Sequence, residues 1–324
     1  MKYKVLVSAP YMQPEVDRFR PVFREYGVDV VVPPVEERME EDELLEWIDD
    51  VDGVICGDDR FTERVLKAAS ELKVISKWGT GIDSIDQEAC RRHGVAVCNT
   101  PDAFSEPVAD TVMGYVLCFA RNLPWMDTAM KDGIWKKIDG FALREATLGV
   151  IGVGDVGKTV VQRAEAFGMR VLGNDRVEMP PSFLESHDVR MVDKKTLLKK
   201  SDFVSLNTDL NETSRHLIDA DALSQMKSAA VLVNASRGPV VDEEALIDAL
   251  NAEEIRGAAL DVFEKEPLPE ESPLRGMSNV MLAPHNANSS PEAWEHVHRN
   301  TIRNLLRELT GSAPINEELQ RLIR

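Results

Sequence analysis

A glycine-rich loop between an apolar run and a helical pattern constrains the fold of this chain more than any other feature. Residues 147–158 read TLGVIGVGDVGK, in which Gly152, Gly154 and Gly157 have the spacing G-x-G-x-x-G. Such a loop lets backbone N–H groups and a helix N-terminus approach a pyrophosphate with no side chain in the way. The spacing alone is a weak signal, because glycine-rich turns are common, so its surroundings decide what it means.

The segment after the loop supplies the second half of a dinucleotide site. Residues 169–174 predict a strand that ends at Asp175, close to the offset at which a carboxylate accepts the adenosine ribose hydroxyls. The strand, the glycine loop, the helix and the acidic residue all fit a dinucleotide-binding site, so we expect NAD as the cofactor. The charge of Asp175 would repel the 2′-phosphate of NADP, but the adjacent Arg176 could lean over the adenine or partly tolerate that phosphate. The sequence therefore leaves the strictness of the NAD preference open.

Short β-rich runs alternate with helical patterns along nearly the whole chain, which is typical of parallel, doubly wound sheets. A first series predicts strands at residues 4–8, 28–32, 53–56, 73–76 and 95–98. A long apolar helix at 107–121 and an amphipathic segment at 125–135 lead to a second series, which begins at Thr147. A last helix, residues 291–309, has an apolar side that we expect to pack on the first domain.

The length of 324 residues exceeds what one hydrophobic core usually supports. We therefore predict an α/β protein made of two doubly wound parallel-sheet domains. A Rossmann NAD-binding domain, residues 102–286, is inserted in a flavodoxin-like substrate domain, which consists of residues 1–101 and 287–324.

The charge balance and the apolar stretches exclude several partners. A formal net charge of −18 argues against nucleic acid and anionic membrane, since both are bound through basic surfaces. The longest apolar stretch, Val112–Ala120, is too short to cross a bilayer, and the N-terminal residues lack the apolar core of a signal peptide. We therefore expect a cytoplasmic protein whose partner is a small molecule.

The four cysteines predict neither disulfides nor a metal site. Cys56, Cys90, Cys98 and Cys118 occupy apolar or strand-like settings without a C-x-x-C spacing. Such settings suit buried thiols in a reducing compartment. We expect no metal.

Three segments at predicted strand ends of the second domain carry side chains suited to hydride transfer. They are NASRGP with Arg237, DVFEKEP with Glu264 and Glu266, and APHN with His285. Interconversion of an alcohol and a ketone needs an acid or base that titrates near neutrality, for which His285 is the candidate. Glu266, on the other ring nitrogen, would fix the tautomer of the histidine. Arg237 would bind a substrate carboxylate and polarise the reacting oxygen.

Each of these residues also has a plainer interpretation. Arg237 could be a surface ion-pair partner, Glu266 an exposed loop acid and His285 a cap of the final helix, because charged residues in loops are usually solvated. Lys77 and Trp78 pose the same choice. They could contact the distal end of the substrate, with Lys77 as a point charge for a phosphate or second carboxylate, or be a solvated lysine beside a packed tryptophan.

Ordered motifs over nearly the whole chain resemble the D-isomer-specific 2-hydroxyacid dehydrogenases, in particular the phosphoglycerate dehydrogenase-like members. Besides the glycine loop, these motifs are GTGIDSID at residues 79–86, NTP at 99–101, NASRG at 234–238, GAALDVFEKEP at 257–267 and PH at 284–285. The resemblance implies catalysis by Arg237, Glu266 and His285. It favours Glu266 over Glu264 as the acid because Glu266 directly precedes the proline.

The same resemblance implies how ligands are held. The backbone amides of Gly79, Thr80 and Gly81 would bind the substrate carboxylate, which fits the physics of a glycine-rich nest. Further cofactor contacts carried over by position are Thr80, Asp155, Val156, Asp175, Thr208, Ala235 and Asp261. The resemblance also implies a homodimer formed through the nucleotide domain and its connecting helices.

The expected activity is the reversible oxidation of a D-2-hydroxyacid to a 2-oxoacid with NAD, and D-3-phosphoglycerate is the first substrate candidate. A glyoxylate or hydroxypyruvate reductase would use the same three residues on a smaller acid. Outside the enzymes, the alternative is a dinucleotide-sensing protein like the transcriptional corepressors that share this fold, which the complete trio disfavours.

Overall fold

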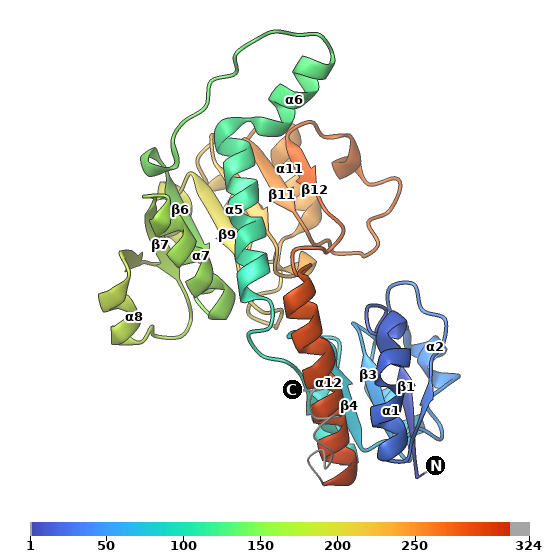
Figure 1. The fold of residues 1–324 in the computed structure, drawn as a ribbon. Helices are drawn as coiled ribbons and strands as arrows, with labels where there is room; N and C mark the ends of the chain where they lie inside the picture. Colours follow the sequence, from blue (N-terminus) through green and yellow to red (C-terminus); the bar gives the residue numbers. More distant parts are fainter. Residues whose placement is uncertain (1, 312–324) are drawn as a thin grey trace. The chain divides into compact units, whose positions relative to one another are not determined.

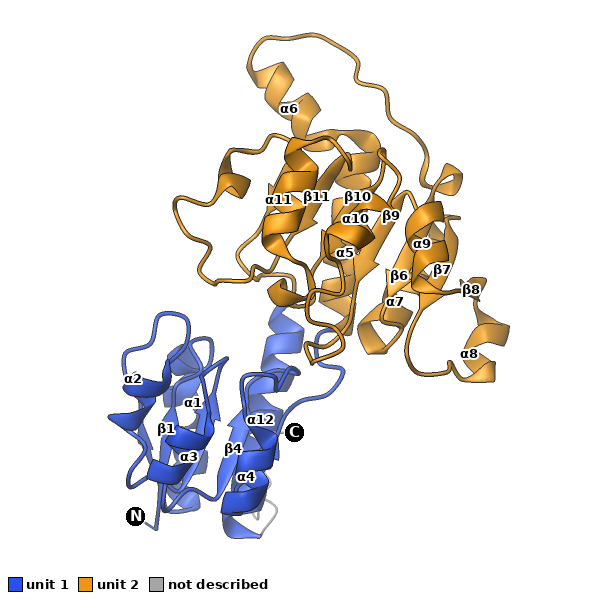
Figure 2. Cartoon of the chain, turned by 180° about the vertical axis from the view of Figure 1, so that it is seen from behind, with its two compact units in different colours: residues 1–104, 290–324 blue, residues 105–289 orange. Residues whose placement is uncertain are grey.

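The computed structural model describes residues 2–311, which form two compact units (Figures 1 and 2). Of the described residues, 2–104 and 290–311 belong to unit 1, and 105–289 belong to unit 2. The chain therefore changes unit after residues 104 and 289, whereas the sequence placed the domain boundaries after residues 101 and 286. The end of the predicted C-terminal segment, residues 312–324, lies outside the described residues.

Unit 1 contains a five-stranded, all-parallel sheet with the order β2-β1-β3-β4-β5. Its strands are β1 (Tyr3–Val7), β2 (Val28–Val31), β3 (Gly53–Cys56), β4 (Val74–Lys77) and β5 (Ala96–Cys98). Its helices are η1 (Gln13–Glu15), α1 (Val16–Glu25), α2 (Glu41–Leu45), α3 (Glu63–Ala68), α4 (Gln87–His93) and α12 (Pro291–Thr310). The strand order is that of the flavodoxin-like sheet, in which the order reverses between β1 and β3.

The last helix, α12, packs on the sheet of unit 1, as its apolar side predicted. A Cβ atom on Gly53 of β3 would lie 2.9 Å from Cδ1 of Leu305 and 3.3 Å from Cδ1 of Leu309. The hydroxyl of Ser76, in β4, donates to the carbonyl of Thr301 at 2.8 Å. The absence of a side chain at Gly53 therefore lets the helix approach the strand closely.

Unit 2 contains a seven-stranded, all-parallel sheet with the order β12-β11-β10-β9-β6-β7-β8. Its strands are β6 (Thr147–Ile151), β7 (Arg170–Asn174), β8 (Val189–Met191), β9 (Phe203–Leu206), β10 (Val231–Asn234), β11 (Gly257–Leu260) and β12 (Val280–Leu282). From β6 the sheet continues through β7 to β8 on one side, and from β9 it continues through β10 and β11 to β12 on the other. The strand order therefore reverses between the neighbours β6 and β9. This is the arrangement of a Rossmann domain, in which ligands bind at the point of reversal.

Helices cover both faces of the sheet in unit 2. They are α5 (Ser105–Arg121), α6 (Leu123–Lys131), η2 (Leu143–Glu145), α7 (Asp155–Ala166), α8 (Pro181–Ser186), α9 (Lys194–Lys200), α10 (Ala220–Ser224), η3 (Gly238–Val240), α11 (Glu243–Asn251) and η4 (Pro273–Gly276). Figure 1 shows α5 and α7 on one face, and Figure 2 shows α9, α10 and α11 on the other. Each face has its own apolar core, and both strand faces are buried, as expected for a parallel sheet.

All four cysteines have free thiols. Cys56 and Cys90 are buried, but Cys98 and Cys118 are only half-buried, so the prediction of buried thiols is wrong for the latter two. Cys98 ends β5, which is an edge strand and has a sheet neighbour on one side only. An edge strand is less covered than a central one, which explains the exposure of Cys98.

Candidate active site

The predicted catalytic side chains follow three strands that lie side by side in unit 2. Arg237 follows β10, Glu266 follows β11, and His285 follows β12. Because β10 pairs with β11 and β11 with β12 in parallel, their carboxyl ends meet at one edge of the sheet. The structure therefore places all three residues at the edge where open α/β sheets bind ligands.

The structure brings Glu266 and His285 into direct contact. Nδ1 of His285 lies 2.9 Å from Oε2 of Glu266, and the two side chains are 25% and 20% exposed. The other carboxylate oxygen, Oε1, accepts a hydrogen bond from the backbone amide of Phe263 at 2.9 Å. Since a carboxylate can only accept, Nδ1 of the neutral ring carries the proton and Nε2 keeps its lone pair. This tautomer can exchange a proton at Nε2.

The backbone of His285 is held in a strained conformation. Its φ angle is +49°, in the left-handed region, which costs a side chain other than glycine about 1–3 kcal/mol. The amide of His285 donates to the carbonyl of Asp261 at 2.7 Å. The buried carboxylate of Asp261 accepts from the amides of Asn286 and Ala287, both at 2.9 Å. Asp261, predicted as a cofactor contact, thus uses both carboxylate oxygens to hold the turn that presents His285.

Arg237 lies on a turn that packs against the turn of Glu266. Nη1 of Arg237 donates to the carbonyl of Ser236 at 2.8 Å, and its own carbonyl accepts from Nδ2 of Asn234 at 3.0 Å. A Cβ atom on the next residue, Gly238, would lie 1.8 Å from the carbonyl oxygen of Phe263. Only glycine therefore allows the turn of Arg237 to contact the turn that carries Glu266.

A second histidine–glutamate pair, which was not predicted from the sequence, lies at the same edge. Nε2 of His216 is 2.6 Å from Oε1 of Glu264, and Nδ1 is 3.9 Å from Oδ2 of Asp242. His216 is 42% exposed and has a φ of +50°. The only sequence signal was the position of Glu264, two residues before Glu266. A contact between residues 48 positions apart leaves no local pattern.

The glycine loop has the backbone that a pyrophosphate site needs. Gly152 has a φ of +86°, and a Cβ atom there would lie 2.6 Å from the carbonyl oxygen of Asn207. A Cβ atom on Gly157 would lie 2.0 Å from the carbonyl oxygen of Gly152, whereas one on Gly154 would meet no atom within 4 Å. The first and third glycines therefore close the turn, and the second leaves open space at the start of α7.

The other predicted cofactor residues lie around this loop. Thr208 follows β9, the neighbour of β6 where the strand order reverses, and a Cβ atom on Gly152 would lie 2.9 Å from its amide. Asp155 and Val156 form the first turn of α7, and Ala235 directly follows β10. These positions fit a dinucleotide whose pyrophosphate lies at the N-terminus of α7.

Asp175 follows β7, as predicted, and it contacts the glycine loop. Its Oδ2 accepts from the amide of Val153 at 2.6 Å, and its Oδ1 from the amide of Val177 at 2.8 Å. The guanidinium of Arg176 lies 3.8 Å from Oδ2 of Asp209, and both side chains are exposed. Asp209 thus offsets part of the positive charge that Arg176 would offer to a 2′-phosphate.

In unit 1, the predicted glycine nest follows β4. Gly79 has a φ of +120°, and its carbonyl accepts from the amide of Thr100 at 2.9 Å. The hydroxyl of Thr80 donates to the carbonyl of Thr100 at 3.0 Å, and Nδ2 of Asn99 donates to the carbonyl of Thr80 at 2.6 Å. The backbone of residues 79–81 is therefore fixed by the segment at 99–100.

Lys77 and Trp78 are both buried, with 4% of each residue exposed. Nζ of Lys77 donates to the carbonyl of Trp78 at 3.0 Å and lies 3.2 Å from Oδ1 of Asp58. The indole Nε1 of Trp78 donates to Nδ1 of His298 at 2.9 Å, and burial lowers the pKa of His298, which favours the neutral acceptor. The interpretation of Lys77 as a solvated side chain is therefore wrong, because β4 is covered on both faces and the ammonium is held by Asp58.

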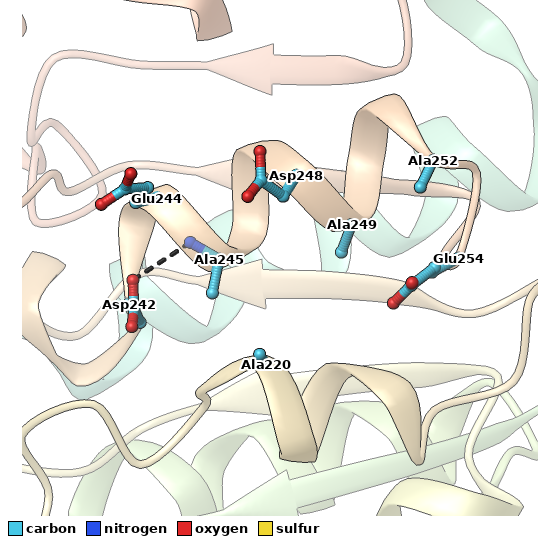
Figure 3. A pocket seen from close by; sticks show the side chains of 8 residues that line it. All are labelled: Ala220, Asp242, Glu244, Ala245, Asp248, Ala249, Ala252 and Glu254. Carbon is cyan, nitrogen blue, oxygen red and sulfur yellow. Dashed lines mark hydrogen bonds between the residues drawn. The ribbon is translucent and has the colours of Figure 1, made fainter.

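A depression on unit 2 lies between α10 and α11 (Figure 3). Its lining consists of Ala220, Asp242, Glu244, Ala245, Asp248, Ala249, Ala252 and Glu254. Asp242 caps α11 by accepting from the amide of Ala245 at 3.0 Å. Four carboxylates would repel an anion, and the depression contains none of the predicted site residues. We therefore assign no substrate to it.

The described part of the chain, residues 2–311, contains neither a candidate membrane-spanning helix nor a candidate metal-binding cluster. No helix there is long and apolar enough to span a bilayer. No group of three or more histidine, cysteine, aspartate or glutamate side chains there is arranged to hold a metal ion.

Comparison with known proteins relates the chain to one enzyme family. Residues 113–287 match the sequence profile described as "D-isomer specific 2-hydroxyacid dehydrogenase, NAD binding domain". The chain is 43% identical over 279 residues to a D-3-phosphoglycerate dehydrogenase of Methanocaldococcus jannaschii. That match covers 85% of this chain but only 53% of the relative, so the chain spans about half the length of that protein.

Other similar proteins match over nearly their full length. A hydroxypyruvate reductase of Thermotoga maritima is 37% identical over 278 residues, which cover 84% of this chain and 90% of the relative. Among solved structures, the TT0316 protein of Thermus thermophilus superposes with a TM-score of 0.83 at 34% identity. That superposition covers 97% of this chain and 99% of the other.

Proposed function

The chain belongs to the D-isomer-specific 2-hydroxyacid dehydrogenase family, and we propose that Arg237, Glu266 and His285 carry out its NAD-dependent reaction. The observation that carries the proposal is the 2.9 Å contact between Nδ1 of His285 and Glu266 at the carboxyl edge of the sheet. It fixes one tautomer and favours the protonated ring when a proton has to be given to substrate.

We propose a different role in the reaction for each of the three side chains. In the reductive direction, the imidazolium of His285 donates the Nε2 proton to the oxygen of the 2-oxoacid, and in the oxidative direction the neutral ring takes it back. Glu266 stabilises the imidazolium. Arg237 polarises the reacting oxygen and binds the carboxylate through its planar fork. In unit 1, the amides of Gly79, Thr80 and Gly81 are proposed to bind the substrate carboxylate.

The cofactor is NAD, and the loop that would hold it has the required form. The open space at Gly154 admits a pyrophosphate, and the N-terminal amides of α7 would donate to it. We propose that Asp155, Val156, Thr208 and Ala235 contact the dinucleotide and that the carboxylate of Asp175 binds the adenosine ribose. When bound, NAD supplies the position that accepts or donates the hydride.

For the substrate, the first candidate remains D-3-phosphoglycerate, which the name of the Methanocaldococcus relative supports. Hydroxypyruvate or glyoxylate is the alternative, supported by the name of the Thermotoga relative. Lys77 is relevant to the choice between a phosphorylated substrate and a smaller 2-oxoacid. Its ammonium lies beside the glycine nest, 3.6 Å from where a Cβ atom of Gly79 would be, but Asp58 already pairs with it. The carboxylate weakens the attraction of this site for a phosphate dianion.

Initial rates of NADH and NADPH oxidation with a panel of 2-oxoacids test the proposal. The panel contains 3-phosphohydroxypyruvate, hydroxypyruvate, glyoxylate, pyruvate and branched 2-oxoacids. We expect turnover with at least one of them and a higher kcat/KM with NADH, because Asp175 repels the 2′-phosphate. Tight NADH binding without turnover of any panel member would contradict the proposal and favour a dinucleotide-sensing protein.

We further propose a cytoplasmic homodimer, in which α6 and the segment after it contribute to the interface. This part of unit 2 exposes several large apolar side chains, namely Leu123 (49% exposed), Met130 (51%), Ile134 (52%), Trp135 (87%) and Ile138 (38%). Monomeric proteins rarely expose apolar side chains in such a concentration, so a partner surface is expected to cover them. The free thiols are consistent with a reducing compartment.

Light scattering after gel filtration measures the oligomeric state. We expect a mass of twice 36.2 kDa for the wild type. Trp135→Glu should shift the protein toward the monomer, because it would bury a charge in an apolar interface. Val177→Glu is the matched control, since Val177 is 61% exposed on unit 2 but lies outside this segment. A dimer that dissociates equally in both variants would contradict the proposed interface.

A further inference from the structure

Glu243, the first residue of α11, contacts the turn that carries Glu266. Its Oε2 accepts a hydrogen bond from the backbone amide of Glu264 at 3.1 Å. Two residues later in the same turn, Glu266 accepts from the amide of Phe263 and pairs with His285. Glu243 therefore fixes one end of a short turn whose other end orients the proposed catalytic histidine.

The surroundings of Glu243 are strongly acidic. Burial raises the pKa of Glu243, the bond from the Glu264 amide opposes this, and the negative charges of Glu264 and Glu266 raise it further. The three carboxylates are therefore close enough to interact. An additional negative charge beside Glu266 favours the imidazolium over the neutral form of the histidine paired with it.

Other charged groups surround this turn. His216, on the loop after β9, pairs with Glu264, and its other ring nitrogen lies 3.9 Å from Asp242 at the start of α11. Arg237 is on the loop after β10, and His285 on the loop after β12. Glu244, the next residue of α11, is exposed and lines the depression described above. Glu243 differs from Glu244 in its contact with the turn, not in its charge.

We propose that Glu243 is a positioning residue for the Glu266–His285 pair: it holds the turn at residues 263–266 through the amide of Glu264 and places a negative charge beside Glu266. The inference rests on the proposed role of that pair in proton transfer. It assigns a function to Glu243 that the catalytic trio does not include. Its consequence is that the ring of His285 stays protonated to a higher pH than Glu266 alone would allow.

A histidine titration followed by NMR tests this in the full-length protein. Carbon-13 labelling of the histidine Cε1 atoms reports each of the six rings, and His285→Asn and His216→Asn assign the two signals of interest. In Glu243→Gln the amide oxygen still accepts from Glu264, but the charge is gone. We expect the titration midpoint of His285 to fall by roughly half a pH unit. In the control, Glu244→Gln, the same charge is removed from an exposed position, and the midpoint should not move.

The same variants have a kinetic consequence. Reduction requires the imidazolium, so the rate falls as pH rises through the midpoint, and Glu243→Gln should move this fall to lower pH while kcat on the plateau changes little. Glu264→Gln is a second variant that removes a neighbouring charge from an exposed side chain. It should also lower the titration midpoint of His285.

The possible outcomes separate the inference from the proposed function. Equal midpoints of His285 in Glu243→Gln, Glu244→Gln and the wild type would overturn the inference, whatever the enzyme turns over. A lowered midpoint in a protein that reduces no 2-oxoacid would support the positioning role and remove the proposed reaction. A lowered midpoint together with a shifted pH profile supports both.

Discussion

Replacement of His285 by asparagine is expected to leave a folded protein that binds NADH but turns over at least about 10³-fold more slowly than the wild type. Asparagine suits the left-handed backbone at this position, where φ is +49°, and its amide can still donate to Glu266. It has no group that titrates near neutrality, so it can neither give nor take the substrate proton. The measurements are kcat with the preferred 2-oxoacid and NADH affinity by fluorescence.

The matched control is His216→Asn. His216 also has a positive φ, +50°, and also pairs with a glutamate, Glu264. The two substitutions therefore remove the same chemistry from the same backbone conformation, at two histidine–glutamate pairs. We expect the control to keep kcat within about tenfold of the wild type, as for a loop residue outside the chemical step. Turnover lost in the control but kept in His285→Asn would exchange the roles of the two histidines.

The architecture was predictable because its signals are local. The strand at residues 53–56 was predicted with the observed ends, since an apolar run bounded by turn residues defines a buried parallel strand. The helix α8 and the strand β8 were not predicted. β8 has three residues, of which only Val189 is buried, and such a short, half-exposed strand at a sheet edge has no periodicity to detect.

The site was predictable in its chemistry but not in its pairings. The glycines of the loop could be identified because their spacing is local and lies between an apolar run and a helical pattern. The contact of Lys77 with Asp58 and that of His216 with Glu264 join separate strand ends, so they depend on the strand order of the folded sheet. The sequence could name Glu264 and Glu266 as candidates, but only the fold gives each its own histidine.

These pairings also explain how a protein with a net charge of −18 can act on an anion. Carboxylates at the edge of the sheet in unit 2 are engaged: Asp261 accepts backbone amides, and Glu264 and Glu266 pair with histidines. These carboxylates therefore contact other groups of the protein instead of facing the ligand. The backbone amides at the N-terminus of α7 would supply positive potential for the cofactor phosphates without any basic side chain.

Replacement of Gly238 by alanine should have a large effect on both activity and stability. The added Cβ would lie 1.8 Å from the carbonyl oxygen of Phe263 and 2.6 Å from the amide of Glu264. Both contacts are with backbone, which has no rotamer to change, so the turn at residues 263–266 must move away. A displacement of about 1 Å at reacting groups costs on the order of 10²-fold in rate, and overpacking costs about 1–3 kcal/mol of stability.

The control for this prediction is Gly276→Ala, because a Cβ atom there would meet no atom within 4 Å. Urea unfolding should give wild-type stability for the control and a lowered midpoint for Gly238→Ala. The displaced turn carries Glu266 and adjoins Arg237, so kcat/KM should fall by at least about 10²-fold in Gly238→Ala even below its unfolding transition. NADH affinity should change much less, because the glycine loop follows a different strand, β6. Full activity of a stably folded Gly238→Ala would show that the reaction does not depend on the close contact between the two turns.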